Sequence, residues 1–547
     1  MSDLVFDFIV VGAGSAGGQL VSELTRSGQH RVLLIEAGGS HKDLKIDMPA
    51  GWGALGNDPK FSWGHWTEPE PMAHGRRVSI PRGRVLGGSS SINGMIYIRG
   101  QQSDYARWVE EGAHGWSWEE LLPDFIATEH QLDLHGNAHG TGGSLTAASL
   151  RSVHPVSRAM VEAARSAGLA RVDDFNSGTA EGCGLYQVNV REGRRDSIAR
   201  RALEPALTRS NLELASHALV DSILFRGKRA VGVRYRRSDG SVTEAHARAE
   251  VIVCAGSLET PGLLMRSGVG PPDQLQALGI PVVSALPGVG QNLQDHAVIP
   301  MAFRLRAGTP SLNPSFRGLG LIKSVLQYLL LRSGPMTTPP AEFGGYFRSD
   351  PALAHTDVQV FGLPVTGDIE SVLKGKQPTT EAQPGLTLAP YQVRPWSRGS
   401  VQLVDRNPQT LPRIQVNYLS DARDQAVVVS ALRWLRGMTA QPALASLIDH
   451  ELQPGPERVR DEALLDWAGQ VLTTGHHPVG TCRIGPSDDP RAVVDAELRV
   501  IGLEGLRVAD ASVMPSLISG NTNATSVVIG HRAARLLAQS AQGSARA

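Results

Sequence analysis

One N-terminal segment constrains the fold of this chain more than any other: residues 6–38, FDFIVVGAGSAGGQLVSELTRSGQHRVLLIEAG. It opens with an apolar, β-branched run that is typical of a buried parallel strand. The pattern Gly12-x-Gly14-x-x-Gly17 follows, then a helical pattern, and then a second apolar run that ends at Glu36. This order predicts a strand–helix–strand unit with a glycine-rich turn after its first strand.

Each residue of this turn has a physical role in holding a dinucleotide. Gly12 allows a tight turn, Gly14 lets the backbone approach a pyrophosphate, and Gly17 lets the helix pack close to the strand. The helix N-terminus offers free N–H groups to phosphates, and the acid at the end of the second strand can accept hydrogen bonds from a ribose. We therefore predict a dinucleotide site, against the alternative of a chance glycine-rich turn, although the motif does not separate NAD from FAD. The predicted contacts are Gly12, Gly14, Ser15, Ala16, Gly17, Glu36 and Ala37.

Composition excludes several classes of partner. The chain has 547 residues, which suits two domains or a discontinuous pair. Lys and Arg together number 53, as do Asp and Glu, so nothing in the charge balance favours a nucleic-acid partner. The three cysteines, Cys183, Cys254 and Cys482, form neither a disulfide framework nor a CxxC metal pair. We expect a cytoplasmic protein from a reducing compartment.

The apolar segments do not predict a membrane span. Asp3 and Asp7 stand where a signal peptide would carry basic residues, so we do not expect a signal peptide. No stretch reaches the roughly 18 uninterrupted apolar residues of a transmembrane helix. The nearest, residues 318–334, is interrupted by Lys323 and Gln327 and predicts an amphipathic core helix. Contact of that helix with a membrane or a partner is the alternative.

The order of the predicted elements indicates an interrupted domain. Five runs alternate like strands between residues 212 and 256, and Asp239-Gly240 marks a hairpin turn between the third and the fourth. Near the C-terminus, a strand ends at Asp510, a Gly/Asn turn follows, and a helix begins near Thr525. The chain is therefore expected to begin and end in one α/β domain, with a second domain inserted. The small, polar tail, residues 541–547, is expected to be disordered.

Four separated blocks carry a resemblance to a known family. They are the N-terminal unit, PRGRVLGGSSSINGMIYIRG (81–100), CAGSLETPGLLMRSGVGP (254–271), and the stretch from HHPVGTCRIG to SGNTNATSVVIG (476–530). In order and spacing the chain resembles the glucose–methanol–choline (GMC) oxidoreductases, and most of all bacterial choline and alcohol dehydrogenases. The resemblance implies a Rossmann-like FAD-binding domain from residues 1–155, 195–300 and 475–540. It implies an inserted α+β substrate-binding domain from residues 156–194 and 301–474.

The second block also makes physical sense as a flavin site. Its many small residues let the backbone pass close to a flat ring system, and the resemblance places residues 93–96 against the isoalloxazine. Some relatives bind FAD covalently through a histidine that matches Ile92, and an alkyl side chain cannot form that bond, so we expect non-covalent FAD. The further FAD contacts that the resemblance implies are Arg84, Gly88, Ser89, Asn93, Gly94, Met95, Ile96, Val220, Ala255, Asp510, Ala511 and Asn523.

The histidine pair His476-His477 precedes a proline. Pro478 restricts the residue before it to an extended backbone, and in an extended chain neighbouring side chains point to opposite faces. The two rings should therefore not enter one site together, which argues against a metal half-site, as does the absence of a nearby cysteine or carboxylate cluster. We expect no metal. The spacing alone does not indicate which ring is functional.

The resemblance assigns roles to this pair. It identifies His477 as the catalytic base and places His476 at the border of the pocket. The second catalytic position matches Asn521, for which a purely structural Asn-rich turn is the alternative. Neutral imidazole is a suitable base near pH 7. His477 would accept the hydroxyl proton, Asn521 would donate to the developing alkoxide, and a hydride would pass to flavin N5.

The resemblance thus implies FAD-dependent oxidation of a primary aliphatic or aryl alcohol to an aldehyde. Glu342 matches a carboxylate that faces the trimethylammonium group in choline enzymes, so a choline dehydrogenase or oxidase is one alternative. A non-redox lyase on the same FAD scaffold, an NAD-binding protein and a non-catalytic flavoprotein are the others. The electron acceptor, whether oxygen, a quinone or another molecule, is left open.

Overall fold

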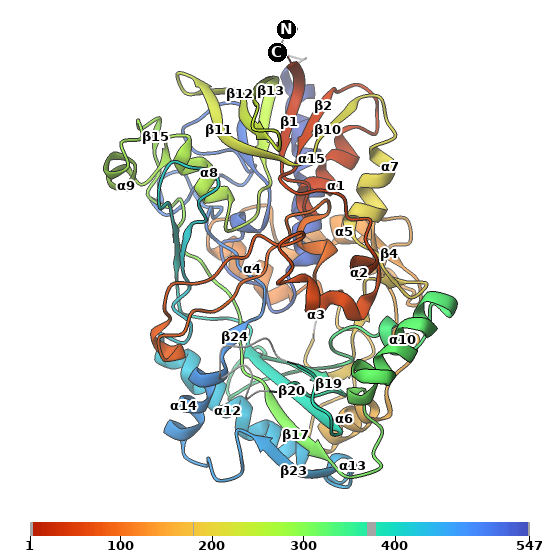
Figure 1. Cartoon of the computed structure of the whole chain (residues 1–547). Helices are drawn as coiled ribbons and strands as arrows, with labels where there is room; N and C mark the ends of the chain where they lie inside the picture. The colour runs from red at the N-terminus through yellow and green to blue at the C-terminus, as the bar shows by residue number, and fades with distance from the viewer. Residues whose placement is uncertain (1–3, 179, 369–378, 545–547) are drawn as a thin grey trace.

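Two large β-sheets lie one above the other in an elongated molecule (Figure 1). The structure is a computed structural model that describes residues 4–178, 180–368 and 379–544. Both chain ends lie at the top of the view, beside the first sheet.

The first sheet has seven strands, in the order β10-β2-β1-β13-β12-β11, with β25 beside β13. Its parallel part, β10-β2-β1-β13-β25, surrounds the N-terminal strand, while β11, β12 and β13 form an antiparallel meander. Its strands are β1 (Leu4–Val11), β2 (Val32–Ile35), β10 (Leu212–Ala215), β11 (Ala218–Arg226), β12 (Arg229–Arg237), β13 (Val242–Val253) and β25 (Leu506–Val508).

The predicted strand–helix–strand unit is confirmed as β1, helix α1 (Ser15–Leu24) and β2. The predicted hairpin turn is confirmed too, because Gly240, with φ +82°, connects the antiparallel strands β12 and β13. The last two of the five predicted runs, however, form one strand. β13 is continuous because it pairs with β12 along residues 242–246 and with β1 along residues 245–253, so the two pairings overlap.

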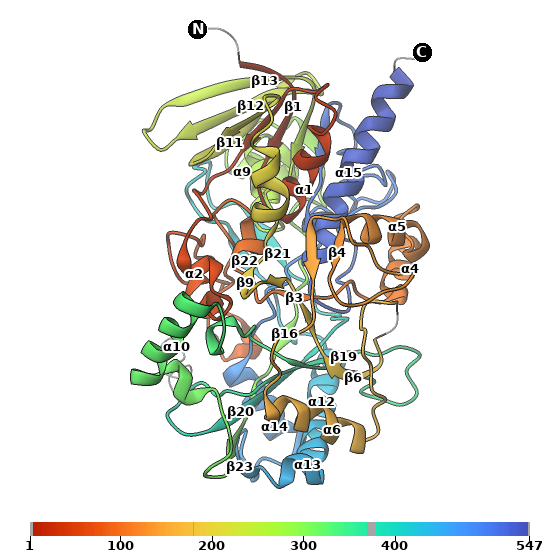
Figure 2. The same cartoon turned by 90° about the vertical axis from the view of Figure 1, so that its right-hand side faces the viewer.

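The chain returns to this sheet at its C-terminal end. Strand β25 pairs in parallel with β13, and helix α15 (Asn523–Ser544) then packs along α1. Figures 1 and 2 show α15, in blue, beside the red N-terminal elements. A Cβ atom added to Gly530 would lie 2.1 Å from the carbonyl oxygen of Ala16, so glycine allows this close packing of the two helices. The helix continues through residue 544, into the segment expected to be a disordered tail, whereas residues 545–547 lie outside the described residues.

The second sheet has eight strands, in the order β23-β17-β20-β19-β18-β6, with β16 joined to β20 and β24. Helices α6 and α12 cover one of its faces, and α13 and α14 pack against them. The strands are β6 (Gly182–Leu185), β16 (Ala297–Val298), β17 (Met301–Leu305), β18 (Phe343–Phe347), β19 (Val358–Leu363), β20 (Gly385–Gln392), β23 (Ile448–Gln453) and β24 (Thr473–Thr474). The helices are α6 (Pro155–Ser166), α12 (Ala422–Thr439), α13 (Pro442–Ala445) and α14 (Asp461–Val471).

Shorter elements connect and flank the two sheets. The helices are α2 (Leu44–Asp47), α3 (Trp52–Leu55), α4 (Gln102–Glu110), α5 (Trp118–Thr128), α7 (Glu204–Ala206), α8 (Thr260–Arg266) and α9 (Pro272–Ala277). The strands are β3 (Ile96–Tyr97), β4 (Glu129–Gln131), β5 (Leu145–Ala147), β7 (Gln187–Val188), β8 (Val190–Arg191), β9 (Arg194–Arg195), β14 (Val269–Gly270), β15 (Ser284–Ala285), β21 (Ser400–Gln402) and β22 (Arg413–Gln415).

The membership of the sheets supports the discontinuous domain division, which we keep as a proposal. Every strand of the first sheet comes from residues 1–155, 195–300 or 475–540. In the second sheet only β16, residues 297–298, comes from those ranges, so the inserted domain would begin a few residues before the predicted boundary at residue 300.

Helix α10 (Gly318–Leu331) corrects one sequence prediction. The pattern predicts an amphipathic core helix, but α10 projects from the side of the molecule (Figures 1 and 2). Most of its leucines are exposed. Among the described residues, no helix is both long and apolar enough to cross a membrane.

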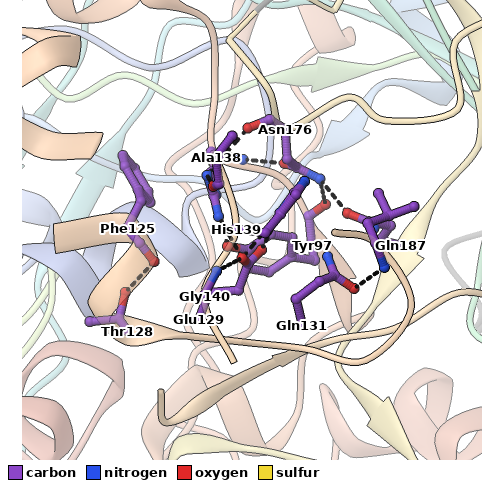
Figure 3. Close-up of polar contacts among 12 residues, drawn as sticks. Tyr97, Phe125, Thr128, Glu129, Gln131, Ala138, His139, Gly140, Asn176 and Gln187 are labelled. Carbon is purple, nitrogen blue, oxygen red and sulfur yellow. Dashed lines mark hydrogen bonds and ion pairs between the residues drawn. The ribbon is translucent and has the colours of Figure 1, made fainter. Parts of the chain in front are cut away.

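A buried polar cluster holds the chain that leads away from the second sequence block. Arg99, just after β3, forms an ion pair of 2.8 Å with Glu129 of β4, and neither side chain is exposed to solvent. Asn176 donates to the carbonyl oxygen of Tyr97 and accepts from the N–H of Arg99 (Figure 3). Because a buried charge needs its partner and hydrogen bonds, this cluster ties β3 rigidly to β4.

The contact between α1 and α15 leads to a stability prediction. Replacing Gly530 with alanine would force the two helices apart, so we expect Gly530→Ala to lower the free energy of unfolding by about 1–3 kcal/mol. Gly437 in α12 is a matched control, since an added Cβ there meets no atom within 4 Å. Gly437→Ala should be neutral or slightly stabilising. Urea unfolding followed by tryptophan fluorescence measures both, and equal effects would contradict the predicted packing.

Candidate active site

A cavity of about 1300 Å³ lies between the glycine-rich turn of the first sheet and the inner face of the second. It is larger than the roughly 300–1000 Å³ of an ordinary ligand pocket, which leaves room for a dinucleotide together with a substrate. Most of the residues predicted from the sequence line it: Gly12, Gly14, Ser15, Ala16, Glu36, Ala37, Gly88, Ser89, Asn93, Gly94, Met95, Ile96, Val220, Ala255, Asp510, Ala511, Asn523, His476, His477 and Asn521.

Three predicted residues lie elsewhere. Gly17 packs under the turn, where an added Cβ would meet the carbonyl oxygen of Gly12 at 2.0 Å, which fits its expected packing role. Arg84 is exposed, and its guanidinium lies 5.1 Å from the ring centroid of Trp63. Glu342 is buried outside the cavity, and its carboxylate accepts a hydrogen bond of 2.8 Å from the N–H of His154 at the start of α6. The expectation that Glu342 faces the substrate is therefore not met.

The glycine turn fits a dinucleotide. Gly12 has φ +102°, and a Cβ there would lie 2.4 Å from the carbonyl oxygen of Cys254, so glycine is required. At Gly14 an added Cβ meets nothing within 4 Å, because the residue faces the open cavity. Ser15 Oγ donates to Asn523 Oδ1 at 2.7 Å, which brings the N-termini of α1 and α15 to the same cavity wall. Two helix N-termini at one wall favour an anionic group such as a pyrophosphate.

Carboxylates hold the backbone around this turn. Glu36 is buried and accepts from the N–H groups of Ala13 at 2.9 Å and Gly38 at 2.8 Å, which leaves further lone pairs for ribose hydroxyls. Asp510 accepts from the N–H of Gly256 at 2.8 Å and from Thr260 Oγ1 at 2.6 Å. The residues present therefore fit the adenosine diphosphate part of a dinucleotide.

The other end of the cavity holds the predicted catalytic pair. His477 is 5% exposed, and its Nε2 lies 3.0 Å from Nδ2 of Asn521. On the other side of the ring, His477 Nδ1 lies 2.9 Å from Nδ1 of His296, a residue that sequence reasoning missed. His296 is fully buried, and its Nε2 lies 3.1 Å from the carbonyl oxygen of Val393.

This chain of contacts determines where the protons are. A carbonyl oxygen only accepts, so His296 Nε2 carries the proton that is donated to Val393. Neutral His296 then has an unprotonated Nδ1, which accepts from the Nδ1–H of His477. His477 Nε2 is therefore unprotonated and has its lone pair on the side of Asn521. The tautomer follows from the hydrogen-bond network, as is usual for histidines.

Burial keeps both rings neutral. Desolvation lowers the pKa of His296 from 6.5 to about 3, partly offset by its bond to the carbonyl of Val393. Desolvation also lowers the pKa of His477 well below 6.5, and the charges that His296, His476 and Arg82 would carry lower it further. At neutral pH, His477 is thus an unprotonated base with its Nε2 directed into the cavity.

Asp295 fixes the backbone of both histidines. Its Oδ1 accepts from the N–H groups of His477 at 2.8 Å and His296 at 2.9 Å. Its Oδ2 accepts from the hydroxyls of Tyr418 and Thr474, each at 2.5 Å. The only sequence signal for this support is the adjacent pair Asp295-His296, which lies about 180 residues before His477.

His476 differs from the sequence expectation in its backbone. Its φ is +65°, which is left-handed rather than extended, and its N–H is held by Thr474 Oγ1 at 2.8 Å. Its ring is exposed and lines the cavity, so the two rings share one cavity although only His477 joins the hydrogen-bond network. Within the described part of the chain, no group of three or more His, Cys, Asp or Glu residues is arranged to hold a metal ion.

Comparison with known proteins identifies the family. The family models described as GMC oxidoreductase match residues 6–298 and 395–530. The chain belongs to the GMC oxidoreductase family. It is an FAD-dependent oxidoreductase that acts on CH–OH groups.

Three similar proteins cover nearly the whole of this GMC oxidoreductase. Mitochondrial choline dehydrogenase of Mus musculus is 41% identical, over 97% of this chain and 89% of its own. Alcohol dehydrogenase [acceptor] of Pseudomonas putida is 37% identical, over 97% of this chain and 96% of its own. The crystal structure of pyridoxine 4-oxidase from Mesorbium loti has a TM-score of 0.86 and 34% identity, over 97% of this chain and 98% of its own. These proteins are similar over both sheets, so the fold is that of a GMC flavoenzyme.

The His296–His477 bond leads to a prediction for a positioning residue. His296→Ala removes the acceptor for the Nδ1–H of His477, so alcohol-driven flavin reduction should slow by roughly 10–100-fold. His296→Asn keeps an acceptor near the same place and should restore most of the rate. Stopped-flow absorbance of the anaerobic protein measures both.

A pH profile separates positioning from general damage. A histidine base works only when it is neutral, so with His477 as the expected base the rate should fall as pH drops through its pKa. Because His296 helps to lower that pKa, the fall should occur at higher pH in His296→Ala than in the native protein. Equal losses in both variants with an unchanged pH profile would mean that His296 has only a structural role.

Proposed function

We propose that this protein oxidises an uncharged primary alcohol, aliphatic or aryl, to the aldehyde, with His477 as the base. The observation that carries the proposal is the unprotonated Nε2 of His477, which the hydrogen bond from Nδ1 to His296 holds in place. An imidazole set in one tautomer and kept neutral by burial is suited to accept a hydroxyl proton.

Each residue group of the site has a separate role in the proposed reaction. Bound FAD, held by the residues around the glycine turn and by residues 93–96, supplies a two-electron acceptor for the hydride. His477 Nε2 accepts the proton of the substrate hydroxyl when that hydroxyl takes the place of the Asn521 N–H at its lone pair. Asn521 Nδ2, which lies 3.0 Å from that nitrogen, has a second N–H that can donate to the substrate oxygen and orient it. Burial of His477 and His296 keeps both rings neutral, so that His477 Nε2 is free of a proton.

The second sheet supplies an apolar wall to this end of the cavity. Residues alternate along β19 and β20, so that one set packs under the helices and the other faces the cavity. The cavity-facing set includes Phe361, Leu363 and Ala389, and Val298 of β16 lines the same space. Glu342, the carboxylate expected to bind a trimethylammonium group, lies outside the cavity. An apolar wall of this kind favours an uncharged alcohol.

Choline is the second candidate substrate. The mouse relative, at 41% identity, is a choline dehydrogenase, and Phe361 could contact a quaternary ammonium group through its ring face. This candidate differs from the first only in the charge of the substrate, so one experiment separates the two.

A panel of alcohols tests the proposal. Anaerobic protein should lose its oxidised-flavin absorbance with aliphatic or benzylic primary alcohols, at lower concentrations than with choline. Faster bleaching by choline than by every uncharged alcohol would reverse the assignment. Bleaching by none of them would contradict alcohol oxidation at this site. Reoxidation with air or a quinone dye then distinguishes the electron acceptors.

Three variants test the catalytic roles with the best alcohol of the panel. His477→Ala should keep FAD and the fold but reduce the rate of flavin reduction by about 10²–10⁴-fold, the usual contribution of a positioned base. His476→Ala should change KM or substrate preference more than the rate, because its ring lies outside the proton-transfer network. Asn521→Ala should be intermediate. A normal rate in His477→Ala together with an inactive His476→Ala would overturn the assignment of the base.

We also propose that FAD is bound without a covalent bond. Ile92 lines the cavity where some relatives have a histidine that bonds to flavin, and its side chain is chemically inert. Acid precipitation should therefore release yellow FAD into the supernatant. Flavin that remains with the precipitated protein would contradict this, and Ile92→His offers a variant with the missing nucleophile for comparison.

A further inference from the structure

Helix α10 is inverted relative to an ordinary surface helix. Its buried side chains are polar, Ser324 and Tyr328, while its outward face is a stripe of aliphatic side chains. The most exposed are Leu319 at 84%, Leu330 at 79%, Leu331 at 70%, Ile322 at 56% and Leu326 at 52%. Surface helices of globular proteins normally bury the apolar face and expose the polar one. A contiguous exposed apolar stripe marks a surface that is covered by something else.

The sequence segment that contains this helix carries charges of one sign. From residue 301 to residue 341 the sequence contains five Arg or Lys residues and no Asp or Glu, although the whole chain has 53 of each sign. Three of these cations flank or lie on the helix: Arg317, Lys323 and Arg332. Arg317 and Lys323 are exposed, and none of the three forms an ion pair with a described residue. Apolar and cationic side chains together match the acyl chains and phosphates of an anionic lipid surface.

The helix lies beside the cavity. Leu312 and Phe316, just before α10, line the cavity, as do Thr338 and Pro339 just after it. Figures 1 and 2 show α10 projecting at the level between the two sheets. Its 14 residues extend about 21 Å, which is too short to span the roughly 30 Å of a bilayer core, so the helix would lie along the surface.

We propose that α10 docks the protein onto an anionic membrane surface, with its aliphatic stripe in the lipid and its cations at the phosphates. The part of the cavity lined by Phe316 and Thr338 would then lie next to the lipid, where an apolar alcohol concentrates. A second copy of the chain is a poorer occupant of this stripe. Two α10 helices in contact would bring like charges together, because the whole segment 301–341 contains no acid.

Vesicle binding of the holoenzyme tests the proposal. The probes are sedimentable vesicles of phosphatidylcholine alone, or of phosphatidylcholine with about a third phosphatidylglycerol. The native protein should sediment with the mixed vesicles, bind the neutral ones more weakly, and be released by salt. Ile322→Gln with Leu326→Gln and Leu330→Gln should weaken binding more than tenfold while keeping helix propensity. Lys323→Gln should weaken binding to the mixed vesicles by about fivefold.

A matched control variant lies elsewhere on the surface. Val242, Val282 and Val459 are exposed by 50%, 40% and 62%, and their triple replacement by Gln should leave vesicle binding unchanged. Flavin reduction by a water-soluble alcohol should be the same in all these variants, which shows that they are folded. Failure of the native protein to bind either vesicle would overturn the proposal. So would a concentration-dependent dimer, seen by analytical ultracentrifugation, that the α10 variant abolishes.

Discussion

The packing of α15 against α1 is the constraint on which the rest of the structure depends. It brings the end of the chain back to the glycine turn at its beginning, and the close approach at Gly530 leaves no room for a side chain. The hydrogen bond from Ser15 to Asn523 then places both helix N-termini at one cavity wall. Asn521, two residues before α15, is carried to the position where it meets His477. A chain that did not close in this way would have neither a complete cofactor site nor a catalytic pair.

A second constraint acts at the other end of the cavity, where the two sheets meet. Asp295 holds the backbone N–H groups of both His296 and His477, from segments far apart in the sequence. The two rings can then form one hydrogen-bonded chain. The carbonyl of Val393 determines the tautomer of His296, and His296 in turn determines the tautomer of His477. In this way the backbone carbonyl of Val393, just after β20 of the second sheet, controls which nitrogen of His477 is unprotonated. The tautomer of His477 thus depends on His296 and Val393, neither of which lines the cavity.

Much of the cofactor site could be predicted from the sequence because its determinants are local. The strand, the three glycines and Glu36 lie within 33 consecutive residues, from Leu4 to Glu36, and their spacing predicts the turn that the structure shows. Other predictions were wrong where a side chain's surroundings come from distant segments. The carboxylate of Glu342 accepts a hydrogen bond from the N–H of His154 and does not face the cavity. Helix α10 exposes the leucines that its sequence pattern predicts to be buried. The extended backbone that Pro478 led us to expect for the histidine pair is left-handed at His476, where Thr474 Oγ1 accepts from the backbone N–H.

The sequence by itself determined the nucleotide-binding turn and the return of the chain to its first domain, and through family resemblance it pointed to His477 and Asn521 as the proposed catalytic pair. These features follow from residue spacing within short segments and from the order of the motifs along the chain. Only the tertiary structure decided the protonation state of the base, the direction of Glu342 and the exposure of α10. Each of these depends on which distant groups desolvate, donate to or cover a side chain, as His296 does for His477 from about 180 residues away. Periodicity and spacing carry no information about such partners, because the partners come from segments that only the packing of the folded chain brings together.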